Sequence, residues 1–180
     1  MNNWIVLFVR TGSEHALKIL LSEKLIKEEF TPFLPIRESL YRRNGICQKI
    51  EKILFPGYIF LKTTLKAEVV INEMWLNLKD TIKDKNIYSI LNYGKNKNDI
   101  IMKEHERISW ENLLDSNGCI AGSIGLIEGD SVQIIDGPLI GMESKIKKIN
   151  RHKREAIVEV EMMGHIKEVK LYLEVIEKNK

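Results

Sequence analysis

The stretch that decides the fold spans residues 128–178 and reads EGDSVQIIDGPLIGMESKIKKINRHKREAIVEVEMMGHIKEVKLYLEVIEK. Gly129-Asp130 opens an alternating segment that places Val132 and Ile134 on one face, and Asp136-Gly137-Pro138 then interrupts it. Glycine adopts backbone angles that other residues avoid and proline lacks a backbone donor, so this interruption predicts a turn after a first strand.

Three further segments of this stretch have strand character, at residues 143–150, 156–162 and 166–173. Apolar residues in them are interspersed with charged ones, and no helical period is present. Four or five short strands in roughly fifty residues, separated by turn residues, predict a small SH3-like β-barrel.

The same stretch resembles a KOW domain, specifically the one that ends NusG-type transcription elongation factors. One position departs from the motif, because Ser144 stands where a further glycine is usual, and this concerns the local backbone rather than the fold. The matching positions are Gly129-Asp130-x-Val132, Asp136-Gly137-Pro138-x-x-Gly141, Ile149-Asn150 with the Lys/Arg-rich turn after it, Val169-x-Leu171, and Glu174-Val175-Ile176-Glu177.

The first two thirds of the chain alternate between strand and helix patterns. Thr11 and Glu14 stand at capping-box spacing before the first helix, and Asn44-Gly45 is a strong hairpin signal. The order strand, helix, two or three strands, helix, strand, helix implies an antiparallel sheet with helices on one side. Strands are expected at 4–9, 33–41, 46–54, 58–61 and 88–93, and helices at 16–25, 67–78 and 103–114.

Local sequence in this part resembles the N-terminal (NGN) domain of NusG proteins. The matching segments are Trp4-Ile5-Val6-Leu7, Gly12-x-Glu14, Pro35 and Leu54-Phe55-Pro56-Gly57-Tyr58-Ile59-Phe60. The resemblance implies an α+β chain in which an NGN domain with a ribonucleoprotein-like antiparallel sheet precedes the barrel. We therefore expect an NGN domain over 1–114, a linker of small residues over 115–126 and a KOW domain over 127–180.

Composition excludes several classes of protein. The 180 residues suit two small domains, and no apolar run is long enough to span a bilayer or to serve as a leader. Cys47 and Cys119 are far apart with no metal-ligand spacing, which fits a reducing cytoplasm and no metal site. No phosphate loop, nucleophile elbow or zinc-protease motif is present, so neither an enzyme nor a cofactor is expected.

The strongest charge feature is a run at 145–154 that holds six Lys or Arg and no acidic residue. Residues 128–180 as a whole carry ten basic and ten acidic residues, so the basic ones are segregated. Such a cluster suits phosphate groups, while the plain alternative is a solvated hairpin with Ile146 and Ile149 inward. The candidate RNA-binding residues are Lys145, Lys147, Lys148, Arg151, His152, Lys153 and Arg154.

The family context favours RNA. In housekeeping members an exposed aromatic-Gly-Arg sequence docks on a ribosomal protein or on Rho, whereas this chain has Met163-Gly164-His165. The aromatic anchor and the fixed cation are missing, and the basic run stands where those members are more acidic. The chain therefore resembles the specialised LoaP group of antiterminators, with a nascent RNA hairpin as partner of the barrel.

The resemblance also implies that the NGN domain binds the clamp helices of bacterial RNA polymerase. Only about half of each strand can face outward, and the two-residue step from Tyr58 to Phe60 favours this pair. Arg10, Ser13 and His15, around the first helix, are candidates for contact with non-template DNA; a solvated strand end is the alternative for Arg10. By position, the candidate polymerase-binding residues are Val6, Phe8, Tyr58, Phe60 and Ile90.

These inferences predict a monomeric, non-catalytic, cytoplasmic elongation factor that acts in processive antitermination. Three alternatives stay open. One is a housekeeping NusG factor whose KOW domain docks a ribosomal protein or Rho, and another is an RfaH-like antiterminator recruited by DNA. The third is a ribosome-associated KOW protein unrelated to polymerase.

Overall fold

The computed structural model describes residues 3–43, 45–83, 86–94, 96, 98–128 and 131–177. Asn44 of the expected hairpin turn and Gly129-Asp130, expected to open a strand, lie outside the described residues. The chain forms two compact units, which we describe separately. Unit 1 comprises Met1–Pro35 and Phe55–Arg107, and unit 2 comprises Ile36–Leu54 and Ile108–Lys180.

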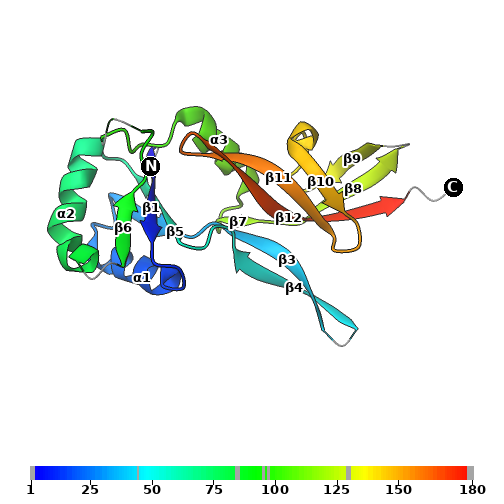
Figure 1. Ribbon diagram of the computed structural model, residues 1–180, viewed down its shortest axis with the longest axis horizontal. Helices are drawn as coiled ribbons and strands as arrows, with labels where there is room; N and C mark the ends of the chain where they lie inside the picture. The colour runs from blue at the N-terminus through cyan, green and yellow to red at the C-terminus, as the bar shows by residue number, and fades with distance from the viewer. Residues whose placement is uncertain are drawn as a thin grey trace. The chain divides into compact units, whose positions relative to one another are not determined.

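Unit 1 is built on one four-stranded sheet with the order β2-β5-β1-β6, antiparallel throughout (Figure 1). Ile5, Leu7, Ile59 and Leu61 share one face of this sheet and are buried. Its elements are β1 (Asn3–Val9), α1 (Glu14–Lys24), β2 (Phe30–Phe33), β5 (Tyr58–Thr63), α2 (Ala67–Lys83) and β6 (Ile87–Ile90), and α3 (Glu104–Leu113) crosses the unit boundary.

The helices of unit 1 bury one face each. Leu17 and Leu21 of α1, and Met74 and Leu78 of α2, are buried at helical spacing. Full burial of each such side chain contributes about 1.5–3 kcal/mol. The expected α+β arrangement of this part, an antiparallel sheet with helices, is confirmed.

The start of α1 differs from the expected capping box. Ser13, not Thr11, is the N-cap, and its side chain makes no capping hydrogen bond. The Glu14 carboxylate instead accepts hydrogen bonds from the backbone N–H of Gly12 (2.8 Å) and of Gly57 (2.7 Å). Glu14 is only 3% exposed. The expected box is wrong because this carboxylate bonds across to the turn before β5.

Unit 2 contains the hairpin from the middle of the sequence together with the C-terminal strands. The register pairs Arg43 with Ile46, and Gly45 has φ +80°, which confirms the predicted hairpin. The elements are β3 (Ile36–Arg43), β4 (Ile46–Ile53), β7 (Cys119–Ile120), β8 (Ser123–Glu128), β9 (Ser131–Asp136), the 3-10 turn η1 (Glu143–Lys145), β10 (Ile146–Asn150), β11 (Glu155–Met162) and β12 (His165–Glu177).

The strand expected at 33–41 is two strands, β2 and β3, separated by Leu34 and Pro35. Proline donates no backbone hydrogen bond and restricts the residue before it, so the pairing changes at this point. β2 joins the sheet of unit 1, whereas β3 pairs with β4 and, in parallel, with β7 of unit 2. The hairpin, assigned from the sequence to residues 1–114, therefore belongs to the other unit.

The segment expected as a linker, 115–126, holds β7 and the first four of the six residues of β8. Its small residues make structured turns rather than a free tether. The Asp115 side chain accepts hydrogen bonds from the N–H of Asn117 and of Cys119, both 2.8 Å, and Ile36 N–H donates to the Gly118 carbonyl at 3.0 Å. Composition alone does not reveal the long-range bond from Ile36.

The C-terminal strands form a five-stranded sheet with the order β10-β11-β12-β8-β9, in which only β12 and β8 run parallel. The strands expected at 156–162 and 166–173 are present, the second extended to Glu177. The turn at Gly137-Pro138 is also present. Gly137 has φ +94°, and a Cβ there would lie 2.6 Å from the Gly122 carbonyl oxygen, so the turn needs glycine.

Glu14→Ala is expected to destabilise unit 1 by about 2 kcal/mol, because it leaves the buried Gly57 N–H without an acceptor. Glu14→Gln keeps one carbonyl acceptor and is expected to lose less. Urea unfolding of the full chain, followed by circular dichroism, measures both. Equal stability of Glu14→Ala and wild type would contradict the assigned role.

Gly122→Ala is expected to destabilise unit 2 by about 1–3 kcal/mol through overpacking. A Cβ at Gly122 would stand 2.1 Å from Cδ1 of the Tyr172 ring, which is itself buried. In a Tyr172→Ala background the same change should cost much less, since the obstructing ring is gone. Denaturant midpoints of the four proteins measure this coupling, and additive effects would contradict it.

Candidate functional site

Residues 145–154, called the basic turn, comprise the last residue of η1, strand β10 and the turn that leads into β11. The Asn150 side-chain oxygen accepts a hydrogen bond from Lys153 N–H at 3.0 Å, and Arg154 N–H donates to the Arg151 carbonyl at 3.2 Å. Arg154 has φ +51°, a conformation uncommon for arginine. Hydrogen bonds therefore define the shape of the turn.

The expectation that Lys145 and Lys147 share one strand face is wrong. Lys145 ends η1, and the register between β10 and β11 shifts between Ile146 and Lys148, which makes Lys147 the extra residue of a β-bulge. Lys147 and Lys148 are consequently both exposed, although they are adjacent in sequence. The spacing Ile146-Lys147-Lys148-Ile149 departs from strict alternation, which is the trace that such a bulge leaves in the sequence.

The basic side chains divide into two groups by their ion pairs. Lys147 Nζ lies 3.1 Å from a Glu159 oxygen, and Arg154 Nη1 lies 3.2 Å from a Glu174 oxygen. The remaining members are exposed, and none makes an ion pair with an acidic residue that the structure describes. This second group consists of Lys145, Lys148, Arg151, His152 and Lys153.

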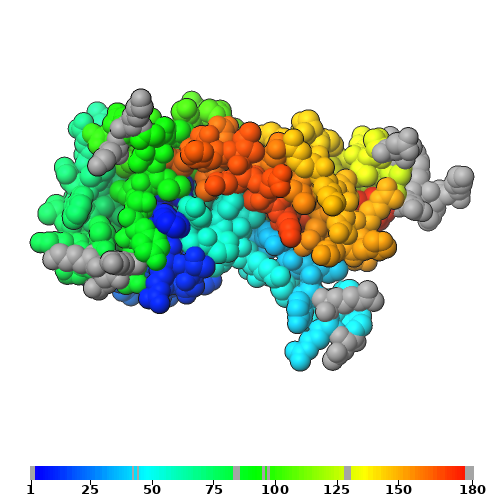
Figure 2. All heavy atoms as spheres, in the orientation of Figure 1, coloured from blue at the N-terminus to red at the C-terminus, as the bar shows by residue number. Residues whose placement is uncertain are grey.

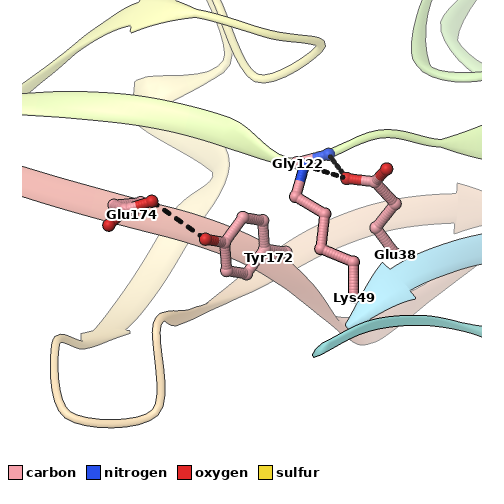
Figure 3. A network of polar contacts seen from close by, with 5 residues as sticks. All are labelled: Glu38, Lys49, Gly122, Tyr172 and Glu174. Atoms are coloured by element: carbon pink, nitrogen blue, oxygen red, sulfur yellow. Dashed lines mark hydrogen bonds and ion pairs between the residues drawn. The ribbon is translucent and has the colours of Figure 1, made fainter. Parts of the chain in front are cut away.

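A network of polar contacts attaches the β3–β4 hairpin to the C-terminal sheet (Figure 3). Glu38 accepts hydrogen bonds from Gly122 N–H at 2.8 Å and from Lys49 Nζ at 3.2 Å. Lys49 Nζ also lies 5.7 Å from the centre of the Tyr172 ring, and the Tyr172 hydroxyl donates to Glu174 at 3.0 Å. Segments far apart in the sequence are thereby joined.

Arg154 extends this network into the basic turn. Its hydrogen bond with the Tyr172 side chain, followed by the charge of Glu174, raises the pKa of the Arg154 guanidinium. Burial, followed by the hydrogen bond to Glu174, raises the pKa of Tyr172. Arg154 therefore stays charged and Tyr172 stays a neutral donor near physiological pH, and both anchor the turn.

A shallow hollow lies beside the basic turn. It opens between the start of β9 and the bulged part of β10, and three basic side chains stand at its edge. The lining residues are Ser131, Val132, Glu143, Ile146, Lys147, Lys148, Ile149 and Arg151.

Unit 1 presents a second candidate surface, formed by three aromatic rings and called the aromatic surface. Phe8 and Tyr58 are directly opposite each other in the β1–β5 register, with ring centres 5.3 Å apart. The Tyr88 ring lies 5.1 Å from that of Phe8. Phe8 is 37% exposed and Tyr88 is 51% exposed. The three rings form a partly exposed apolar patch.

Val6 and Phe60 share this sheet face by register but are 0% exposed. The Phe60 ring packs against Phe33, with centres 5.5 Å apart, and against Trp4 at 6.4 Å. The expectation that Phe60 faces outward with Tyr58 is therefore wrong, since other side chains of unit 1 cover that end of the face. Val6 and Phe60 are therefore core residues that adjoin the aromatic surface on the same sheet face.

Ile90 lies apart from the other polymerase-binding candidates. It pairs with Leu7, which points to the opposite face of the sheet from Phe8. Ile90 lines an apolar groove beside α2, together with Met74, Trp75 and Tyr88. Tyr88, which the sequence did not single out, takes the expected place because the β1–β6 register shifts between Phe8 and Val9.

The DNA-binding candidates lie together at the β1–α1 connection. Arg10 and His15 are exposed, Ser13 is half-buried, and Ser13 N–H donates to the Arg10 carbonyl at 3.1 Å. The buried Glu14 carboxylate occupies the same helix start. Because Glu14 already supplies a negative charge there, the helix start offers less to a phosphate than its sequence indicates.

None of the described helices is long and apolar enough to cross a membrane.

A family model and individual relatives point to the same family of proteins. A family model described as transcription termination factor NusG matches residues 2–109. Transcription termination/antitermination protein NusG of Halalkalibacterium halodurans is 23% identical over 98% of this chain and 98% of its own length. The protein of that name from Thermus thermophilus is 26% identical over 93% and 94%.

Among solved structures, that of Thermotoga maritima NusG, described as showing a domain interaction, aligns with a TM-score of 0.53 and 19% identity. The alignment covers 94% of this chain and 93% of that one, which supports a shared α+β fold. The family model spans more than half of the chain, and relatives carrying the family name match almost its whole length. The chain therefore belongs to the NusG family of transcription termination and antitermination factors.

Proposed function

We propose that this protein is a non-catalytic, cytoplasmic elongation factor that acts in processive antitermination as a monomer, most similar to the LoaP group. Its NGN domain, near residues 1–114, binds the clamp helices of RNA polymerase. Its KOW domain, an SH3-like barrel near residues 127–180, binds a structured RNA. Family membership supports the general role, and the basic turn supports the RNA partner.

The observation that carries the RNA proposal is the pre-ordered set of cations on the basic turn. Lys148, Arg151 and Lys153 are exposed and make no ion pair with a described acidic residue, so phosphate contact costs them no internal partner. The turn that presents them is already held by hydrogen bonds. Preorganisation of this kind lowers the entropy lost on binding.

The aromatic surface supports the polymerase proposal. Phe8, Tyr58 and Tyr88 offer partly exposed rings on three neighbouring strands of one sheet. Partly exposed aromatic residues are enriched among the anchors of protein interfaces. A helical element of the clamp would pack its apolar side chains on these rings, with Arg10 and His15 available at one end for non-template DNA.

The mechanism follows from differential binding. The NGN domain can disfavour a paused, open polymerase only by binding the closed state more tightly. Because both domains belong to one chain, RNA that emerges from the same polymerase meets the KOW domain at a raised effective concentration. A modest RNA affinity then becomes selective for particular transcripts.

We expect the triple variant Lys148→Glu, Arg151→Glu, Lys153→Glu to lose most RNA affinity and to reduce the salt slope of binding by about 2–3. These three cations are chosen because Lys147 and Arg154 make internal ion pairs whose loss would disturb the fold. Fluorescence anisotropy of the full chain with RNA hairpins from the leader of its own operon, in a salt series, measures both quantities.

The matched control is Lys24→Glu, Lys27→Glu, Lys66→Glu, which changes net charge equally at exposed positions of unit 1. It should bind RNA nearly as wild type does. Equal losses in both triple variants, or wild-type binding that is the same for every RNA and disappears near physiological salt, would reject the RNA proposal. The housekeeping alternative, docking on a ribosomal protein or Rho, would then be favoured.

Tyr88→Ala is expected to weaken binding to core RNA polymerase by about 2 kcal/mol, roughly thirtyfold, as loss of a central aromatic anchor does. Its ring is half exposed, so the fold should tolerate the change. Leu76→Ala removes an exposed apolar side chain from α2 and serves as the control. Biolayer interferometry with immobilised polymerase measures both, and unchanged affinity of Tyr88→Ala would contradict the placement.

A further inference from the structure

The β3–β4 hairpin is basic and unusually exposed. Residues 36–53 contain five basic and two acidic residues. Tyr41 and Ile46 are large side chains left in solvent, and Cys47, Gln48 and Lys49 along β4 are exposed as well. Figure 2 shows the hairpin, in light blue to cyan, extending beyond the orange residues of the β10–β11 region in the same unit.

A groove separates the hairpin from the basic turn within unit 2. Leu40 of β3 and Cys47 of β4 form one wall. The opposite wall is formed by the four consecutive residues at the end of the turn, His152, Lys153, Arg154 and Glu155. Among the described lining residues, those of the hairpin are uncharged and those of the turn are predominantly basic.

Resting on the proposed RNA-binding function, we propose that this groove is part of the RNA site and that the hairpin forms its second wall. A backbone strand of a structured RNA enters it, with phosphates toward His152 and Lys153 and the ribose side toward Leu40 and Cys47. Phosphates favour this basic wall because each contact releases counterions. The uncharged wall accepts the less polar sugar.

The charges at the groove set its polarity. Glu155 is the one acidic residue among the lining residues that the structure describes. Its carboxylate also acts on Arg37, whose pKa is lowered by burial and raised in part by Glu155. Glu155 therefore has a nearby cation of its own, which reduces its repulsion of a phosphate at Lys153.

Polar contacts within unit 2 hold the two walls of the groove in place. Glu38 joins Lys49 of the hairpin to Gly122 before β8, and Lys49 stands over the Tyr172 ring of β12. Arg154 on the far wall is held by Glu174 of the same strand. Both walls are thus attached to β12, so an RNA strand finds the two surfaces already in position.

The reactivity of the Cys47 thiol reports whether the groove is occupied, and it can be measured in the unmodified protein. This thiol is exposed at the groove wall, whereas Cys119 is buried. Burial, followed by the charge of Asp115, raises the pKa of the Cys119 thiol to about 11. Because the thiolate is the reactive form, an alkylating reagent at mildly alkaline pH should modify Cys47 and leave Cys119 as an internal reference.

The first measurement is the rate of Cys47 alkylation in the full chain, with and without saturating leader RNA hairpin, read by mass spectrometry. If RNA fills the groove, the rate should fall at least about tenfold, since bound RNA excludes the reagent from the thiol. An unchanged rate under conditions where anisotropy shows saturated RNA binding would overturn the groove proposal and leave RNA binding elsewhere on the turn.

The second measurement compares Cys47→Glu with Gln48→Glu. The two add the same charge at adjacent exposed positions of β4, but strand alternation places only residue 47 on the groove side. Cys47→Glu should weaken RNA binding about five- to tenfold by repulsion at close range, and Gln48→Glu by less than about twofold. Equal effects of the two variants would contradict a groove-specific contact.

These outcomes separate the inference from the function on which it rests. If the triple variant of the basic turn loses RNA but Cys47→Glu binds as Gln48→Glu does, the hairpin wall is wrong and the RNA function stands. If neither the triple variant nor Cys47→Glu changes binding, both are rejected. A duplex DNA of matched length that protects Cys47 equally well would reject RNA as the specific occupant.

Discussion

The arrangement of unit 2 depends on one contact area, where the buried Tyr172 ring lies against Gly122 and the Glu38–Lys49 pair. A Cβ on Gly122 would stand 2.1 Å from that ring, so the chain between β7 and β8 can pass only as glycine. Glu38 accepts from Gly122 N–H and Lys49 at the same point. Through Tyr172, Glu174 and Arg154 the contact continues to the basic turn. The orientation of the hairpin and of the turn, and with them every proposed RNA contact, follows from this packing.

The sequence predicted what depends on local pattern and missed what depends on distant partners. The strands at 156–162 and 166–173, the hairpin turn before Ile46 and the helix at 67–78 follow from alternation, turn chemistry and helical spacing. The hairpin's membership of unit 2 does not follow from such local patterns, because it rests on parallel pairing with Cys119-Ile120, some eighty residues away. The segment expected as a linker holds β7 and the start of β8, whose strand partners β3 and β12 are likewise distant in the sequence.

The candidate sites show the same limit at the level of side chains. The composition of the basic turn was visible, but which cations are available was not. A bulge at Lys147 and acidic partners on β11 and β12 decide that question, and the acidic partners are not local in sequence. On the aromatic surface, a register shift next to Phe8 brings Tyr88 to the position expected of Ile90. Residue type was therefore predictable, whereas register, which selects the exposed member of each pair, was not.

Charged groups in this protein perform two different tasks, and the structure separates them. Lys49, Lys147 and Arg154 form ion pairs with Glu38, Glu159 and Glu174, respectively. These pairs order the elements that carry them. Lys148, Arg151 and Lys153 make no such pairs among the described residues and remain hydrated. Counterions condensed on a nucleic acid are released only by cations that are not already neutralised, so the second group sets the salt dependence of binding. The first group sets the geometry, and loss of its members should alter affinity by way of stability rather than by way of the salt slope.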